Sequence, residues 1–159
     1  MAQKEKQGVI TVATNRKAFH NYHITDTYEA GIVLTGAEVK SMRDKQVSME
    51  QSFARLDGGQ AFLHNLNIKP YRYDHNLAVY EPARTRKLLL NRTELKKLLG
   101  RVSIKGCTIV PLEIYFKNGW AKVKLGLAEG KKAVDKRDDI KKKDVEREVR
   151  REFKADFRS

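Results

Sequence analysis

The residues of this chain that could do chemistry are mostly cations. Its 159 residues include 33 Lys and Arg against 20 Asp and Glu, a formal net charge of +13. Residues 130–159 hold 12 of the basic and 8 of the acidic residues, so residues 1–129 still carry +9. A charge of this size, spread over the whole chain, favours a polyanionic partner, and nucleic acid is the one that we expect. The alternative is a basic protein that is merely soluble.

Catalytic and metal-binding patterns are missing from the sequence. The four histidines, at positions 20, 23, 64 and 75, form no HxH or HxxxH pair, and Cys107 is the only cysteine. A single cysteine excludes an internal disulfide and a Cys-based zinc site. There is no GxSxG segment, and Gly130-Lys131-Lys132 lacks the other residues of a phosphate-binding loop. We therefore expect no enzyme activity, metal, cofactor or small-molecule substrate.

The hydropathy pattern gives no sign of a membrane or secretory protein. No apolar run approaches the roughly 18–20 residues of a membrane span, and residues 1–8 lack the apolar centre of a signal peptide. We expect a soluble, cytoplasmic protein with no membrane partner.

Two N-terminal segments carry candidate nucleic-acid contacts. In the first, Asn15, Arg16 and Lys17 precede His20 and Tyr22. The histidine fits a base-stacking or phosphate-contacting role, although an ordinary exposed histidine is an equal alternative. In the second, apolar spacing predicts a short helix over residues 37–44, from which Lys40 and Arg43 project on neighbouring faces.

Two later segments combine basic residues with apolar ones and carry further candidate contacts. Residues 83–90 place Arg84, Arg86 and Lys87 before a run of leucines, and arginine can both pair with phosphate and stack on bases. A solvated loop leading into a buried helix is the alternative there. In residues 120–128, Lys122 and Lys124 alternate with apolar neighbours, so we expect both on the outward face of a strand.

Strand and turn patterns dominate residues 1–129 and predict a mainly β fold with short helices. Residues 52–56 and 60–68 alternate around Asp57-Gly58-Gly59, and residues 107–117 and 120–128 flank Asn118-Gly119, both strong hairpin patterns. Further strands are expected at Val9–Val12 and over residues 22–34, with Gly31 at a bulge or bend and Pro111 at an edge or bulge. About six short strands favour a small antiparallel barrel or sandwich, such as the OB type.

A second helix is expected before residue 100. Asn91 fits its N-cap, Glu94 three residues later completes a capping-box pattern, and Gly100 fits its C-terminal end. Residues 71–87 before it form a long, basic loop, which we expect to be functional or mobile.

Residues 130–159 form a separate tail, charged almost from end to end. Its main apolar residues, Val145, Val149 and Phe153, recur every fourth position and make one narrow stripe on a helix. Such a stripe is too small to stabilise a helix alone. We therefore expect a tail that is disordered in the free protein and becomes helical on a surface of RNA or protein; a frayed helix without a role is the alternative.

Five segments resemble the SmpB family of bacterial proteins that bind transfer-messenger RNA (tmRNA). They are NRKAFHNY, EAGIVLTGAEVKSMR, PARTRKLLL, YFKNGWAKVKLGLA and GKKAVDKR, in the family's order and spacing over about residues 8–140. The resemblance implies an OB-like body over residues 1–129 that binds the tRNA-like domain of tmRNA and brings it to stalled ribosomes for trans-translation. It also implies that the tail, residues 130–159, enters the empty messenger channel of the small subunit and folds there as a helix.

The resemblance also assigns residues. Asn15, Glu29, Leu89 and Lys122 match the family's RNA contacts, and His20 matches a histidine that faces the decoding centre of the small subunit. In the tail, the matching residues are Lys131, Lys132, Asp135, Lys136 and Arg137. Glu129 and Asn21 depart from the family's usual basic and acidic residues. The alternative function is a general single-stranded nucleic-acid-binding OB module, which would lack specificity for tmRNA.

Overall fold

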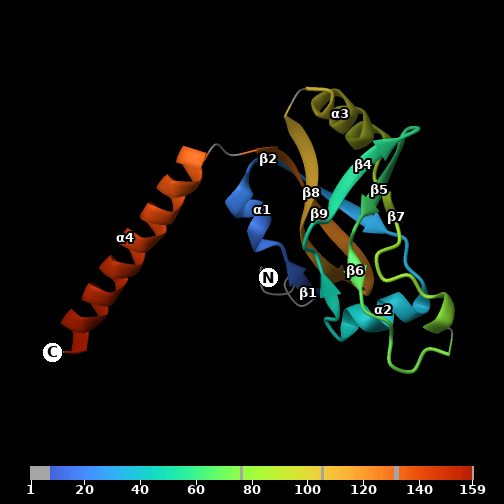
Figure 1. Ribbon diagram of the computed structural model, residues 1–159, viewed down its shortest axis with the longest axis horizontal. Helices are drawn as coiled ribbons and strands as arrows, with labels where there is room; N and C mark the ends of the chain where they lie inside the picture. Colours follow the sequence, from blue (N-terminus) through green and yellow to red (C-terminus); the bar gives the residue numbers. More distant parts are fainter. Residues whose placement is uncertain (1–7, 76, 105, 131–132, 159) are drawn as a thin grey trace.

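The structure is a computed structural model that describes residues 8–75, 77–104, 106–130 and 133–158. Within these ranges it has nine strands, four α-helices and one 3-10 helix (Figure 1). The strands are β1 (Val9–Thr14), β2 (Tyr22–Ile32), β3 (Val47–Ser48), β4 (Phe53–Asp57), β5 (Gln60–His64), β6 (Asn67–Ile68), β7 (Arg86–Leu89), β8 (Cys107–Lys117) and β9 (Trp120–Gly130). The helices are α1 (Arg16–Asn21), α2 (Gly36–Arg43), α3 (Arg92–Val102), α4 (Ala133–Arg158) and the 3-10 helix η2 (Leu77–Val79).

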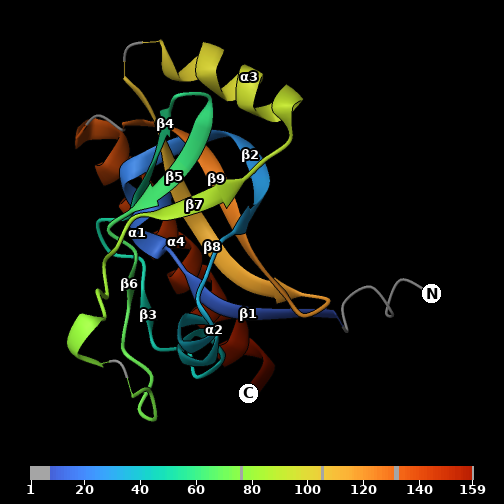
Figure 2. The same cartoon turned by 90° about the vertical axis from the view of Figure 1, so that its right-hand side faces the viewer.

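The main sheet is antiparallel and curls into a partly closed barrel. Its strand order is β1-β8-β4-β5-β7-β2-β9, and β9 also pairs with β8, which completes the ring. Two seams are short: β4 meets β8 at a single residue pair, and β2 meets β7 at two. Helices α3 and α2 lie at opposite ends of this barrel (Figure 2). The expected mainly β, antiparallel barrel with short helices is confirmed.

Both predicted hairpins are present, and their turns explain why the sequence revealed them. Gly58 and Gly59 have φ of 57° and 76°, and Asn118 and Gly119 have φ of 53° and 82°. Positive φ at both central residues is typical of the two-residue turns that match strand twist. The second hairpin joins β8 to β9, the longest strand pair of the barrel.

The prediction of a bulge at Gly31 is wrong. Gly31 pairs regularly with Leu89 on one side and Lys122 on the other, whereas the register of β2 shifts between Ile24 and Asp26. A Cβ atom at Gly31 would lie 3.3 Å from the Cβ of Leu89, so glycine here allows a close approach of β7. The bulge expected near Pro111 is present, as a register shift between Pro111 and Glu113.

The helix ends differ from the predicted ones. Asn91 precedes α3 but its side chain makes no capping hydrogen bond, and α3 continues through Gly100 to Val102. The capping box lies instead at α2, where Thr35 accepts from the Glu38 backbone and Glu38 accepts from the Thr35 backbone. Helix α1 was not expected, and β7 begins inside the segment that was predicted to be a loop.

Two apolar clusters hold the body together. The larger fills the barrel and draws on β2, β4, β5, β7, β8 and β9, with Met42 of α2 and Leu98 of α3 closing its ends. The smaller joins Ala18 of α1 to Val110, Leu112 and Ala128. Helix α4 contributes no residue to either cluster among those that the structure describes, and it extends away from the barrel beyond α1 (Figures 1 and 2).

Candidate nucleic-acid interface

Three neighbouring strands, β7, β2 and β9, bring predicted RNA contacts onto one outward face of the barrel. In the strand register, Leu89 of β7 is paired with Gly31 of β2, which is paired with Lys122 of β9. One step along, Glu29 of β2 is paired with Lys124 of β9. Since side chains alternate along a strand, Leu89, Glu29, Lys122 and Lys124 share one side, while the intervening Val123 and Leu125 are buried. We call this surface, with Lys87, Tyr115 and Lys117, the outer face.

Glu29 is held in place on the outer face by two neighbours from β8. Its carboxylate accepts a hydrogen bond of 2.5 Å from the Tyr115 hydroxyl and lies 3.5 Å from the Lys117 ammonium. The Tyr115 hydrogen bond lowers the pKa of Glu29, burial opposes this, and Lys117 lowers the pKa further. Burial and the Glu29 carboxylate in turn raise the pKa of Tyr115. Glu29 is therefore a fixed acceptor that remains charged at neutral pH.

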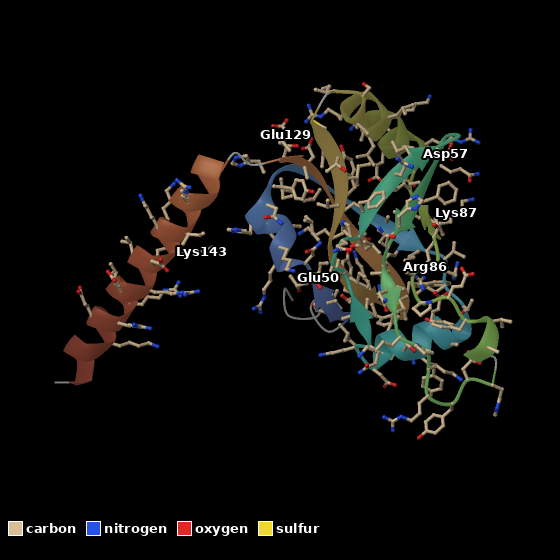
Figure 3. All side chains as sticks on the ribbon, in the orientation of Figure 1. Glu50, Asp57, Arg86, Lys87, Glu129 and Lys143 are labelled. Carbon is tan, nitrogen blue, oxygen red and sulfur yellow. The ribbon has the colours of Figure 1, made fainter. Side chains whose placement is uncertain are left out.

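Leu89 supplies an apolar contact beside these charges. Its side chain is 52% exposed, and it lies against the backbone at Gly31. Lys87, two residues earlier on β7, is also exposed (Figure 3). The outer face thus combines several lysines, one fixed carboxylate and an exposed leucine, a mixture that suits a sugar–phosphate backbone with one base or sugar edge.

Helix α1 forms a second basic segment, next to β8. The Asn15 side chain donates to the Pro111 carbonyl at 2.9 Å and accepts from the Ala18 amide at 3.2 Å, so it fastens and caps α1. Arg16 is exposed, and Lys17 forms an exposed ion pair with Glu50. His20 and Tyr22 are half-buried, and Tyr22 packs against the smaller apolar cluster.

Lys40 and Arg43 lie on α2, at one end of the barrel and away from α1. The Lys40 ammonium is 5.3 Å from the centre of the Tyr71 ring, and the Arg43 guanidinium is 5.8 Å from the Phe116 ring. Both cations are exposed on their outer side. The structure therefore does not gather all predicted contacts into one surface: the outer face, α1 and α2 are three separate basic regions.

The prediction that Arg86 contacts RNA is wrong. Its side chain is fully buried and pairs with Glu38, which is buried as well (Figure 3). The remaining guanidinium N–H groups donate to the carbonyls of Leu66 at 2.6 Å and Pro82 at 3.0 Å. A cation with all its donors used inside the protein fixes the preceding loop and cannot reach a phosphate. Arg84 binds the other Glu38 oxygen and is only one-third exposed, so it shares this role.

The tail residues are only partly described. Lys131 and Lys132 lie outside the described residues, as do the side chains of Asp135, Lys136 and Phe153. Arg137 is exposed, and the side chains of Val145 and Val149 are 58% and 57% exposed. Helix α4 therefore presents the Val145 and Val149 part of its predicted apolar stripe to solvent.

Among the described residues, no three His, Cys, Asp or Glu side chains stand close enough to bind a metal ion together. Within the same part of the chain, no helix has the length and apolar character needed to span a bilayer.

Comparison with known proteins decides the family. A sequence model described as "SmpB protein" matches residues 12–155. The chain belongs to the SmpB family. A relative from Elusimicrobium minutum (strain Pei191), named SsrA-binding protein, is 56% identical over 154 residues, which is 97% of each chain. The protein of the same name from Geobacillus thermodenitrificans (strain NG80-2) is 51% identical over 147 residues, 90% of this chain and 92% of its own.

A solved structure of the family agrees with the fold. It comes from a study described as "tmRNA-SmpB: a journey to the center of the bacterial ribosome". It is 53% identical, has a TM-score of 0.64, and covers 79% of this chain and 86% of its own. The resemblance to the SmpB family that five sequence segments indicated is thus confirmed.

Sequence reasoning missed three residues that shape this SmpB-family surface. Tyr115 and Lys117 hold Glu29, and Glu38 holds Arg84 and Arg86. Alternation along β8 could have placed Tyr115 and Lys117 outward. Choosing Glu29 as their partner needs the register of β2 against β9, which a single sequence does not reveal.

Proposed function

We propose that this chain binds the tRNA-like domain of tmRNA and delivers it to stalled ribosomes, where trans-translation rescues the ribosome and tags the incomplete protein. Membership of the SmpB family over residues 12–155, with relatives named SsrA-binding protein, carries this proposal, because SsrA is tmRNA. The protein acts without catalysis, metal or cofactor, in the cytoplasm.

The outer face is the proposed main contact with the tRNA-like domain. Lys122 and Lys124 bind phosphates, Leu89 packs against a sugar or base, and Glu29 accepts a hydrogen bond from a base edge. The Tyr115 and Lys117 contacts support this role for Glu29, since they hold an otherwise repulsive carboxylate in one position. Arg16, Lys17 and His20 of α1 and Lys40 and Arg43 of α2 are the proposed contacts with other RNA segments, including the decoding centre for His20.

The body and the tail are proposed to be separate units. Residues 1–129 bind tmRNA, whereas the tail, residues 130–159, is only marginally ordered in the free protein and is stabilised as the helix α4 when it enters the empty messenger channel. The exposure of Val145 and Val149 supports this division, because a helix whose apolar residues are exposed is marginal in water. On the ribosome, the tail would detect that messenger RNA is missing.

A competition gel-shift tests the proposal against the alternative of a general single-strand binder. The labelled tRNA-like domain of tmRNA is bound to the full chain and then challenged with bulk tRNA or single-stranded DNA at equal nucleotide concentration. Both functions predict salt-sensitive binding, since both rest on phosphate contacts. We expect only unlabelled tRNA-like domain to compete well. Equal displacement by all three competitors would favour the general binder.

A further inference from the structure

Trp120 is the chain's only tryptophan, and its side chain is 73% exposed. It is the first residue of β9, directly after the Asn118-Gly119 turn. It lies two residues before Lys122 and four before Lys124, so strand alternation puts all three side chains on the outer face. Each is about 7 Å from the next one along the strand. Lys117 is directly opposite Trp120 across the hairpin.

The hairpin holds this indole in a defined position. Asn118 and Gly119 form a tight turn with positive φ, and the Asn118 amide donates to the Gly8 carbonyl at 2.8 Å. One step below, Phe116 is paired with Ala121 and is buried in the main apolar cluster. Trp120 projects from the outward side of this hairpin tip and is 73% exposed. Its apolar surface contributes little to the core, so its exposure calls for a partner outside the chain.

The charges around Trp120 identify the kind of partner. Lys117 and Lys122 are its neighbours across and along the hairpin. Lys117 also pairs with Glu29, so the two lysines and this carboxylate leave a net positive charge that attracts phosphates. A large flat ring between cations is the arrangement with which proteins hold single-stranded nucleic acid, because every base has a face that stacks on an aromatic ring.

We infer that Trp120 is a stacking platform for an unpaired base of the bound RNA, extending the outer face to the tip of the β8–β9 hairpin. The neighbouring Lys122 then binds the phosphate attached to a stacked nucleotide. Identifying this RNA as the tRNA-like domain of tmRNA rests on the proposed function, whereas stacking on an RNA base does not.

Tryptophan fluorescence tests the inference directly, because no second tryptophan contributes to the emission. The full chain is titrated with the tRNA-like domain of tmRNA and, separately, with an unstructured RNA of equal length. Stacking should quench the emission in step with binding measured by gel-shift. Replacement of Trp120 by Ala should weaken binding about 5- to 150-fold.

Matched variants separate stacking from simple loss of surface. Trp120→Phe keeps an aromatic face and should retain most of the affinity, whereas Trp120→Leu is apolar without a ring and should bind like Trp120→Ala. Leu99→Ala is the control, since Leu99 on α3 is 59% exposed but lies outside the outer face, and its affinity should be unchanged. Thermal unfolding confirms that each variant is folded.

The outcomes distinguish the two proposals. Unchanged fluorescence at saturating RNA, with normal binding by Trp120→Ala, overturns the stacking inference and leaves the proposed function intact. The same result with a loss of tagging in a reconstituted translation system also overturns it, and assigns Trp120 to a protein contact on the ribosome. Quenching by the unstructured RNA, without preference for the tRNA-like domain, supports stacking and counts against the proposed function.

Discussion

Glu38 and Arg86 are both charged and both fully buried, an arrangement that proteins use sparingly. Burial raises the pKa of Glu38, but hydrogen bonds from Arg84 and Thr35 and the charge of Arg86 outweigh it, and the net pKa lies below its ordinary value. The carboxylate therefore remains charged at neutral pH and ties α2 to the segment that leads into β7. Three predicted RNA contacts, Arg84, Arg86 and Lys87, lie at this junction. The network buries Arg86 and occupies the one-third exposed Arg84, while Lys87 remains exposed.

Replacing Glu38 by Gln should destabilise the body by about 3–5 kcal/mol at pH 7, because two guanidinium groups lose their counter-charge. Glutamine can still accept in the capping box, so the cap is largely preserved. A carboxyl with a lowered folded pKa stabilises the protein above its unfolded pKa of about 4.3, and this stabilisation is lost as the pH falls further. Urea unfolding should therefore show a smaller difference between variant and wild type at pH 3 than at pH 7.

The control for this experiment is Glu50→Gln, which removes only the exposed ion pair with Lys17. Exposed pairs contribute roughly 0–1 kcal/mol, so this variant should unfold almost as the wild type does. If Glu38→Gln behaved like Glu50→Gln at pH 7, the buried network would not be the anchor of the loop.

Lys122→Ala should weaken binding to the tRNA-like domain and reduce the slope of log affinity against log salt by about one phosphate contact. The side chain projects from the outer face and contributes nothing to the apolar core, so folding should be unaffected. Lys96→Ala on α3 is a suitable control, because it removes an equal charge outside the outer face. Filter binding at several salt concentrations measures both slopes, and an unchanged slope for Lys122→Ala would exclude a phosphate contact.

At the scale of elements, the sequence predicted those features that depend on residues close together in the chain. The Asp57-Gly58-Gly59 and Asn118-Gly119 turns predicted their hairpins correctly, because few residue types readily adopt positive φ. Gly31 was misinterpreted, because a glycine needed for close approach looks the same in sequence as one at a bulge. The burial of Arg86 could not be predicted from the sequence, since its partner Glu38 is 48 residues away and contacts it only in the folded arrangement of β7 and α2. Helix α1 was missed because it has only six residues.

Helix α4 leads to a prediction about helicity. Val149→Pro places proline inside the helix, which costs about 3 kcal/mol and removes a backbone hydrogen bond. In the free protein the change should leave thermal unfolding unaltered, because Val149 is exposed and packs on nothing in the core. On a stalled ribosome, tagging should fall while tmRNA binding persists. A reconstituted tagging assay measures both.

Val149→Ala is the matched control, because alanine favours the helix but shortens the apolar stripe. Normal tagging with Val149→Ala and impaired tagging with Val149→Pro would assign the effect to helicity. Impairment by both would point to the apolar contact, and normal tagging with both would show that charge alone is sufficient in this part of the tail.

At the scale of the whole molecule, the described apolar core lies in the body, whereas positive charge is present in both the body and the tail. The described members of the two apolar clusters lie between residues 12 and 128, before the proposed tail begins. The positive charge continues across both parts, with +9 in residues 1–129 and +4 in residues 130–159. A folded body and a charged appendage of this kind can act in sequence on one large RNA–protein target: the body captures, and the tail enters a channel that the body cannot.

Truncation after Gly130 tests this division. The barrel should keep its thermal stability, because no described residue of α4 belongs to either apolar cluster. Binding to the tRNA-like domain should largely survive, since the outer face and a charge of +9 remain, although the salt dependence should decrease if the tail also touches phosphates. Tagging on stalled ribosomes should be lost, because nothing would occupy the messenger channel. Gel-shift and reconstituted tagging on the same preparation separate the two activities. A truncated chain that unfolds earlier, or that no longer binds the tRNA-like domain, would place part of the tail within the body's own binding surface.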